Sequence, residues 1–150
     1  MDNDDVIATL NDLIQTSRDG EEGFRTCAES AKDPELQAVF KTGGRRCAES
    51  VRELQAEVTR LGGKAEQSGS LAGSAHRRWL GIKSAITGKD DKAVLAECER
   101  GEDVAKASYE AALKKDLPPG IRGIVQRQYE GVLQNHDKVR GLERAAKASS

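Results

Sequence analysis

The fold is decided by residues 2–62, which read DNDDVIATLNDLIQTSRDGEEGFRTCAESAKDPELQAVFKTGGRRCAESVRELQAEVTRLG. Apolar or small residues recur in this stretch at steps of three and four, which is the spacing of one face of an α-helix. Asp33-Pro34 interrupts the pattern, because proline disfavours helical geometry in the residue before it and suits the first turn of a new helix. The stretch therefore predicts two helices, about 4–32 and 35–62, joined by a tight turn and ended by Gly62-Gly63.

The middle of the seam between these two helices is polar and small rather than apolar. A helical seam normally places Leu, Ile and Val in its central layers, because those layers lose the most water. We therefore expect this layer either to make room for something or to line something. Its members are Ser17, Gly20 and Glu21 on the first helix and Gly43, Cys47 and Ser50 on the second.

Two adjacent glycines, Gly43-Gly44, lie inside the second predicted helix. Each should cost about 1 kcal/mol relative to alanine, so we expect a packing reason for them. Close approach to the first helix, or to another subunit, would be such a reason.

Three more helices are expected after residue 64, at about 71–86, 91–115 and 119–148. The turn signals are Thr87-Gly88-Lys89-Asp90 and Leu117-Pro118-Pro119-Gly120. A helix of the length of 35–62 extends for roughly 40 Å. The connection over 64–90 is long enough to return along that length, which would make the second and fourth helices parallel. We therefore predict an all-α, ferritin-like four-helix bundle of two antiparallel hairpins, in one domain over 1–150, with a short extra helix in the crossover.

Composition excludes several classes of function. The 24 basic and 25 acidic residues leave no charge excess for nucleic-acid binding. The N-terminus is acidic where a secretory signal would be basic, and no apolar run approaches the roughly 20 residues of a membrane span. The three cysteines show no disulfide or zinc-ribbon spacing. We expect a cytoplasmic protein with reduced thiols.

Five potential metal ligands fall near one level when residues are counted outward from the two proline turns. Two carboxylates would favour iron or manganese, whereas two thiols and an imidazole would favour zinc or copper. The five candidates are Glu21, Cys47, Cys98, Glu102 and His136.

The sequence lacks the Glu-x-x-His pairs that di-iron and di-manganese bundles carry on two helices. Glu49 is followed three residues later by Arg52, and Glu99 by Glu102. Three interpretations stay open: an intact di-iron site, a mononuclear or degenerate site using thiolate and imidazole, and a structural layer. In the structural layer, thiols are buried for packing, and the carboxylates pair with arginine. The arginines considered are Arg45, Arg46 and Arg100.

The chain resembles a bacterial family of four-helix-bundle proteins of unknown function in the ferritin-like superfamily, over nearly its whole length. The resemblance implies the fold with its crossover helix and a stress-related or housekeeping role, and it does not imply iron storage. The residues that carry it are Asn11-Asp12-Leu13-Ile14, Asp19-Gly20, Gly23-Phe24, Glu53-Leu54-Gln55, Leu61-Gly62-Gly63, Gly69-Ser70, His76-Arg77-Arg78-Trp79, Glu99-Arg100-Gly101-Glu102-Asp103, Tyr109 and His136-Asp137.

The crossover segment carries a distinctive tetrapeptide, His76-Arg77-Arg78-Trp79, with the only tryptophan of the chain. His76, Arg77 and Trp79 could contact an acidic partner or a membrane surface. The alternative, which we favour, is that Trp79 packs the crossover onto the bundle while the charged side chains pair with nearby carboxylates.

No phosphate-binding loop, nucleophile elbow or dinucleotide-binding pattern is present in the sequence. A Cys98–His136 pair is conceivable, but both residues should face a closed core. The sequence therefore favours a non-enzymatic structural or interaction protein that forms a homo-oligomer, most simply a dimer. The alternative is a metal-binding bundle with an oxidase or metal-handling role, using iron, manganese or zinc.

Overall fold

The computed structural model describes residues 1–65 and 90–148 of the chain. Four helices account for most of them, and no strand occurs within these two ranges. The helices are α1 (Asn3–Ser30), α2 (Pro34–Arg60), α4 (Asp91–Leu113) and α5 (Pro119–Ala148). The all-α prediction is confirmed for this part of the chain, and the observed helix ends lie within two residues of the predicted ones. The short helix predicted at 71–86 lies outside the described residues.

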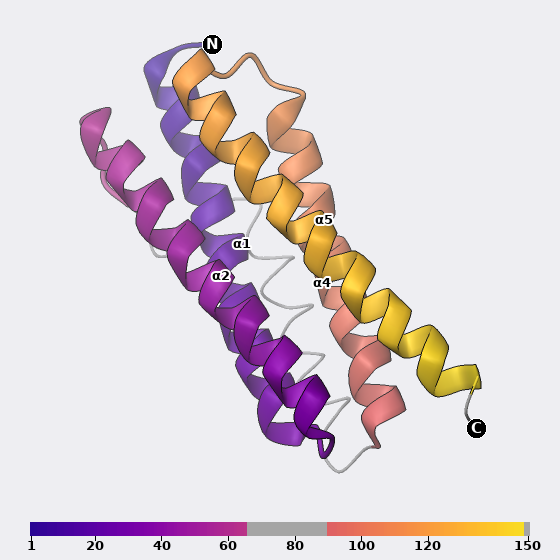
Figure 1. Ribbon diagram of the computed structural model, residues 1–150. Helices are drawn as coiled ribbons and strands as arrows, with labels where there is room; N and C mark the ends of the chain where they lie inside the picture. Colours follow the sequence, from indigo (N-terminus) through magenta and orange to yellow (C-terminus); the bar gives the residue numbers. More distant parts are fainter. Residues whose placement is uncertain (66–89, 149–150) are drawn as a thin grey trace.

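The helices form two antiparallel hairpins that lie side by side, α1 with α2 and α4 with α5 (Figure 1). Contacts between the hairpins join α1 to α4 and α2 to α5. The start of α4 lies at the α1–α2 turn, where the Asp91 carboxylate accepts the backbone N–H groups of Lys32 (2.8 Å) and Asp33 (3.0 Å). The end of α2 lies beside the start of α1, where Asn3 donates to the Leu61 carbonyl (2.9 Å). Helices α2 and α4 are therefore parallel, and the end of α2 and the start of α4 lie at opposite ends of the bundle.

Side chains at the helix ends explain where the helices begin and stop. Asp2, Asp33 and Asp90 each cap a helix by accepting a backbone N–H of its first turn, which would otherwise have no partner. At the other end of α2, Gly62 has φ +83°, a conformation that favours glycine. The Gly62 and Gly63 N–H groups bond the carbonyls of Thr59 and Val58, both at 3.0 Å, so this end is a Schellman motif. The predicted stop at Gly62-Gly63 is confirmed.

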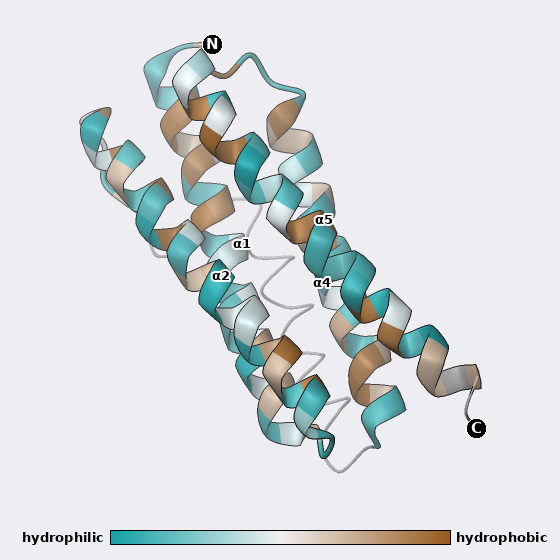
Figure 2. Cartoon of the chain, in the orientation of Figure 1, coloured by the Kyte–Doolittle hydropathy of each residue, from teal (hydrophilic) through white to brown (hydrophobic). Residues whose placement is uncertain are grey.

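The apolar core is divided into two clusters, one toward each end of the bundle. The cluster near the α1–α2 turn includes Phe24, Phe40 and Leu95, and the other includes Leu10, Leu54 and Val125. Apolar residues alternate with hydrophilic ones along every helix, as expected for helices with one buried face (Figure 2). Between the clusters lies a layer in which polar side chains are buried.

Gly43 lets the Phe24 ring lie directly against the backbone of α2. A Cβ atom at Gly43 would stand 3.0 Å from two atoms of that ring, closer than such contacts normally occur. The expected packing reason for this glycine is therefore confirmed, and it is close approach to the first helix. Gly44 has more room, with its nearest contact, the Phe24 Cβ atom, at 3.6 Å.

None of the helices in the described ranges combines the length and apolar character needed to cross a lipid bilayer.

Candidate functional site

A cavity of about 40 Å³ lies in the centre of the bundle, between the two apolar clusters. Since one water needs roughly 10–15 Å³ of such space, the cavity has room for about three waters. All four described helices contribute to its wall. The lining residues are Thr16, Ser17, Gly20, Phe24, Gly43, Arg46, Cys47, Ser50, Glu102, Ala105, Tyr109, Gln128, Gly131, Val132 and Asn135.

The cavity lies where the sequence predicted an unusual central layer. Five of the six residues named for that layer line it, which confirms that small and polar residues make room there. Glu21 does not. Its side chain is exposed and lines a separate groove on the outer face of α1 and α2, so the inward placement predicted for Glu21 was wrong.

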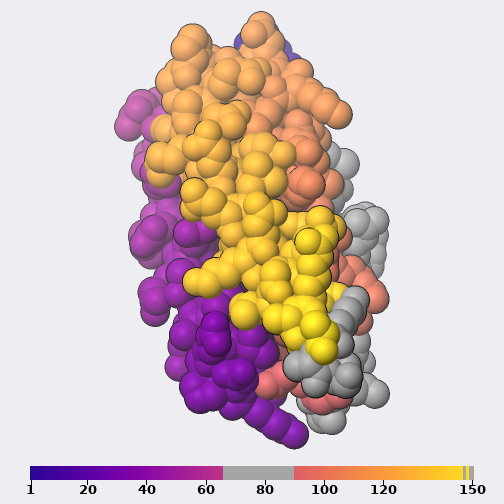
Figure 3. All heavy atoms as spheres, turned by 45° about the vertical axis from the view of Figure 1, so that its right-hand side comes forward, coloured from indigo at the N-terminus to yellow at the C-terminus, as the bar shows by residue number. Residues whose placement is uncertain are grey.

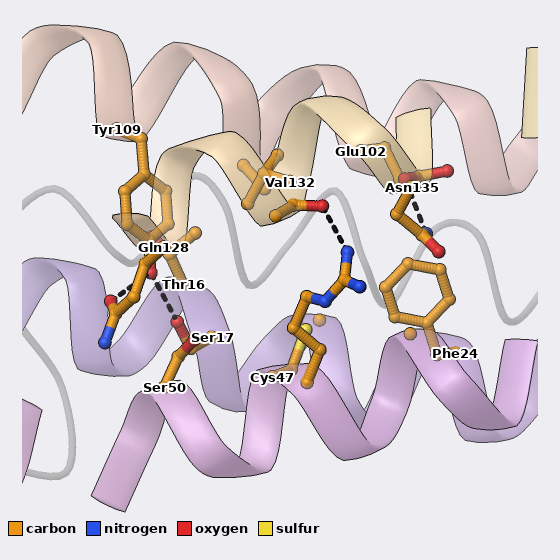
Figure 4. A pocket seen from close by; sticks show the side chains of 15 residues that line it. Thr16, Ser17, Phe24, Cys47, Ser50, Glu102, Tyr109, Gln128, Val132 and Asn135 are labelled. Atoms are coloured by element: carbon orange, nitrogen blue, oxygen red, sulfur yellow. Dashed lines mark hydrogen bonds between the residues drawn. The ribbon is translucent and has the colours of Figure 1, made fainter. Parts of the chain in front are cut away.

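At one end of the cavity, Tyr109 begins a chain of hydrogen bonds that reaches the protein surface. Its hydroxyl lies 3.3 Å from Ser17 Oγ and donates to Gln128 Oε1 at 2.9 Å (Figure 4). The Gln128 amide in turn donates to Glu53 Oε1 at 3.1 Å, and Glu53 is paired with Arg127. Burial raises the pKa of Tyr109 to about 12, so its hydroxyl is protonated at neutral pH.

At the other end of the cavity, Glu102 is almost fully buried, with 2% of its surface exposed. Its carboxyl group accepts a hydrogen bond from Asn135 Nδ2 at 2.8 Å and lies 3.6 Å from the Cys98 thiol. No arginine, lysine or histidine pairs with Glu102 among the residues described. Burial therefore raises its pKa to about 7, although the bonds from Asn135 and Cys98 oppose the shift. Figure 4 shows Glu102 and Tyr109 at opposite ends, with Val132 between them.

The three cysteines lie in the same region of the bundle and are all reduced. Cys27 and Cys98 belong to the apolar cluster near the α1–α2 turn, and their thiols interact with each other. Burial raises the pKa of Cys47 to about 12 and the pKa of Cys98 well above its usual value. Neither thiol is ionised at neutral pH, and the thiolate is the nucleophilic form. The site as folded therefore holds no activated cysteine at these two positions.

The five predicted metal ligands do not form one cluster. Cys98 and Glu102 are in contact, and Cys47 lines the same cavity as Glu102. The imidazole of His136 is buried but bonds Asp103, with Nε2 2.7 Å from Oδ1, and Glu21 faces the outer groove. Within 1–65 and 90–148, no three His, Cys, Asp or Glu side chains are arranged to hold a metal ion. Metal binding itself stays a prediction.

Glu102 also does not pair with any of the three arginines that the sequence suggested as partners of buried carboxylates. Arg46 donates to the backbone carbonyl of Gly131, Arg45 to the Thr42 hydroxyl, and Arg100 pairs with Glu97. The partners of Glu102 are the neutral amide of Asn135 and the thiol of Cys98. Neither is a cation that would keep its carboxyl group ionised.

Sequence reasoning missed a regular set of polar pairs between α4 and α5. Two inner pairs, Glu102–Asn135 and Tyr109–Gln128, are buried, and two outer pairs, Asp103–His136 and Glu110–Tyr129, lie nearer the surface. The second inner pair lies seven residues further along α4 and seven residues back along α5 from the first, and the same holds for the outer pairs. A polar repeat of one heptad in both helices was the signal that could have revealed the pairing.

A family model described as a domain of unknown function, DUF2383, matches residues 5–115. The chain belongs to this family. No curated protein matches it. The match covers α2, α4 and all but the first two residues of α1, and thus Ser17, Cys47, Glu102 and Tyr109 of the cavity wall. The wall contributed by α5 lies beyond the end of the match.

The crossover residues His76, Arg77 and Trp79 lie outside the described residues, so their expected role in packing or in partner contact stays a prediction.

Proposed function

We propose that this DUF2383 chain is a ferritin-like bundle that acts as a non-enzymatic structural or interaction protein and associates with itself. The observation that carries the proposal is the small volume of the central cavity, together with the raised pKa values of the acidic groups in its wall. Glu102, Cys47 and Tyr109 face a cavity of about 40 Å³, and burial raises the pKa of all three. A space for about three waters is too small for a substrate, and the Cys47 thiol and the Tyr109 hydroxyl stay protonated at neutral pH, so the layer supports a packing role better than a catalytic one.

The ferritin-like assignment is supported by the connection between the hairpins. Parallel α2 and α4 with one long crossover is the ferritin-like connectivity, whereas four helices joined by short loops would alternate in direction. The positions of Asn3 beside Leu61 and of Asp91 beside Lys32 are the contacts that support it.

The surface that we assign to self-association is the groove of about 560 Å³ on the outer face of α1 and α2. Small residues, Ala28, Gly44 and Ala48, allow another helix to approach closely there. The groove also carries charges of both signs. A two-fold axis brings such a surface against itself, so an acidic residue of one copy can face a basic residue of the other. The charged residues are Glu21, Arg25, Glu29, Lys41 and Arg45.

Sedimentation velocity tests this proposal directly. We expect the wild-type chain to sediment as a dimer at tens of micromolar, and Ala48→Arg to shift it to monomer because a long cation would fill the groove. Ala111→Arg is the matched control, since Ala111 is exposed on α4, away from the groove. A wild-type monomer under these conditions, or equal effects of the two substitutions, would contradict self-association through this surface.

A second candidate function, metal binding, is favoured by one observation: Cys47 and Glu102 line the same cavity, and the Cys98 thiol contacts Glu102. We propose as its test metal analysis of protein purified without chelator, together with melting curves after addition of iron, manganese, zinc or copper. A bound metal should raise the melting temperature by mass action, and Glu102→Leu should abolish the gain while keeping the fold. Substoichiometric metal with unchanged melting would exclude this candidate.

A further inference from the structure

The seam between α2 and α5 is the most open of the four helix contacts. These two helices contact each other least of the neighbouring pairs. Figure 3 shows α5, in orange to yellow, crossing the face of the molecule beside α2, in purple. Arg46 lines the central cavity and also two grooves that follow this seam on the outside. Its side chain therefore separates the cavity from the surface.

The two grooves differ in charge. In the first, of about 270 Å³, Arg46 is accompanied by Glu49, Glu53 and Glu130, and Glu53 is already paired with Arg127. The second, of about 210 Å³, has two cations and no carboxylate in its lining. This cationic groove is lined by Val39, Thr42, Arg46, Gln134, Asn135 and Lys138.

Neither cation of the cationic groove has a carboxylate partner in the part of the chain that the structure describes. Arg46 uses Nη1 to donate to the Gly131 carbonyl. A guanidinium has five N–H donors, so others remain for a ligand. Lys138 has no ion pair within residues 1–65 and 90–148. Two cations from facing helices beside two amides and a hydroxyl form a surface that suits an anion.

A glycine on α5 makes this arrangement possible. A Cβ atom at Gly131 would stand 3.0 Å from Cδ of Arg46, so any larger residue would displace the arginine. The position of the guanidinium at the mouth of the cavity thus depends on both helices.

From this geometry we propose that the cationic groove binds a small oxyanion, a phosphate or carboxylate group, which bridges Arg46 on α2 to Lys138 on α5. The volume of about 210 Å³ is below the roughly 300–1,000 Å³ of pockets for drug-sized ligands, so the occupant is a small ion or the charged end of a larger molecule. Arginine forms two parallel hydrogen bonds to such groups, and lysine adds a second positive charge. The bound anion joins the two helices that contact each other least.

Titration of the full chain with inorganic phosphate, followed by calorimetry and by melting temperature, tests the site. Sodium chloride at matched ionic strength controls for screening, and sodium acetate distinguishes a carboxylate from a phosphate group. We expect phosphate or acetate to raise the melting temperature beyond the chloride control. The more effective anion identifies the class of ligand.

Two substitutions should weaken binding by about tenfold or more each, Arg46→Gln and Lys138→Gln, because each removes a charge-assisted contact. Lys138 is exposed, so Lys138→Gln should fold normally even if Arg46→Gln does not. Lys114→Gln removes an exposed lysine at the end of α4, outside the cationic groove and outside the proposed dimer surface, and should bind as the wild type does. The proposal is overturned if neither oxyanion raises the melting temperature beyond the chloride control, or if Lys114→Gln weakens binding as much as Lys138→Gln.

Discussion

Tyr109 and Glu102 lie one heptad apart on α4, both buried, and both bonded to an amide of α5. Burial raises the pKa of each, to about 12 for Tyr109 and to about 7 for Glu102. Burial therefore moves the pKa of Tyr109 further above neutral pH, whereas it brings the pKa of Glu102 close to neutral pH. Within one buried layer, the ordinary pKa of a group therefore decides whether burial lets it change its charge near neutral pH.

The surroundings reinforce this difference. Tyr109 is connected through Gln128 to the partly exposed Glu53–Arg127 pair, so the hydrogen-bond chain from its buried hydroxyl reaches the surface. Glu102 is enclosed by Asn135 and Cys98, with Cys27 beyond. Ionisation of Glu102 would therefore leave a charge that neither a cation nor bulk water offsets directly.

The largest change in the free energy of unfolding is expected from Tyr109→Ala, which removes one of the two compared side chains. This change removes a buried aromatic side chain from the apolar cluster at its end of the cavity, and it should lower the free energy of unfolding by about 3–5 kcal/mol. Urea denaturation followed by circular dichroism measures it. A loss below about 1 kcal/mol would show that Tyr109 is not packed as the structure describes.

The next effect is a pH dependence of the free energy of unfolding, which we expect from Glu102 and not from Tyr109. Folding raises the pKa of Glu102 from its ordinary value of 4.5 to about 7, so the folded state holds the proton more tightly. The stabilisation from this bound proton is fully present below about pH 4.5 and is lost as the pH rises to about 7. At roughly 1.4 kcal/mol per pKa unit, the free energy of unfolding should fall by about 3 kcal/mol over this range. Glu102→Gln keeps the neutral shape, and we expect it to be more stable than the wild type above pH 7.

The measurement is urea denaturation across this pH range on both proteins, because subtraction removes the contribution of every other titrating group. Parallel stability curves for the wild type and Glu102→Gln would contradict the raised pKa of Glu102.

A smaller effect, without pH dependence, is expected for Tyr109→Phe. The ring remains, but Gln128 Oε1 loses its donor and Ser17 loses a partner, which should lower the free energy of unfolding by about 1–2 kcal/mol. Because Tyr109 stays protonated over the accessible range, the difference from the wild type should be constant between about pH 5 and 9. A difference that changes with pH there would indicate coupling between the two ends of the cavity.

The smallest change in the free energy of unfolding is expected at the surface end of the hydrogen-bond chain that begins at Tyr109. Arg127→Gln removes an ion pair whose side chains are 60% and 37% exposed, so the loss should stay below about 1 kcal/mol and shrink with added salt. Chemical denaturation at low and high salt measures it. A loss as large as that of Tyr109→Phe would show that Glu53 is needed to hold Gln128 in place.

The sequence was sufficient for the helices and for the central layer because their signals are local. Asp33-Pro34 and Gly62-Gly63 mark helix ends through backbone geometry alone. The break in the apolar pattern of the seam likewise marks Ser17, Gly43 and Cys47, all of which line the cavity.

What the sequence could not resolve was rotation about the helix axis. Neighbouring residues differ by about 100° around a helix, so Gly20 faces inward while Glu21 faces the outer groove. In the same way Asn135 reaches Glu102, whereas His136 reaches Asp103. Counting along a helix predicts the level of a side chain but not its direction around the helix axis, and a metal site requires both.

The polar pairs between α4 and α5 depend only on how the two helices face each other, and not on which molecule supplies each helix. An α5 exchanged between two molecules would satisfy Glu102 and Tyr109 equally well, so these pairs offer no protection against domain swapping. That protection comes from Pro118 and Pro119, because proline lacks a backbone N–H and its ring clashes with the preceding turn. The two prolines thus prevent α4 and α5 from joining into one continuous helix that would present α5 to a neighbour.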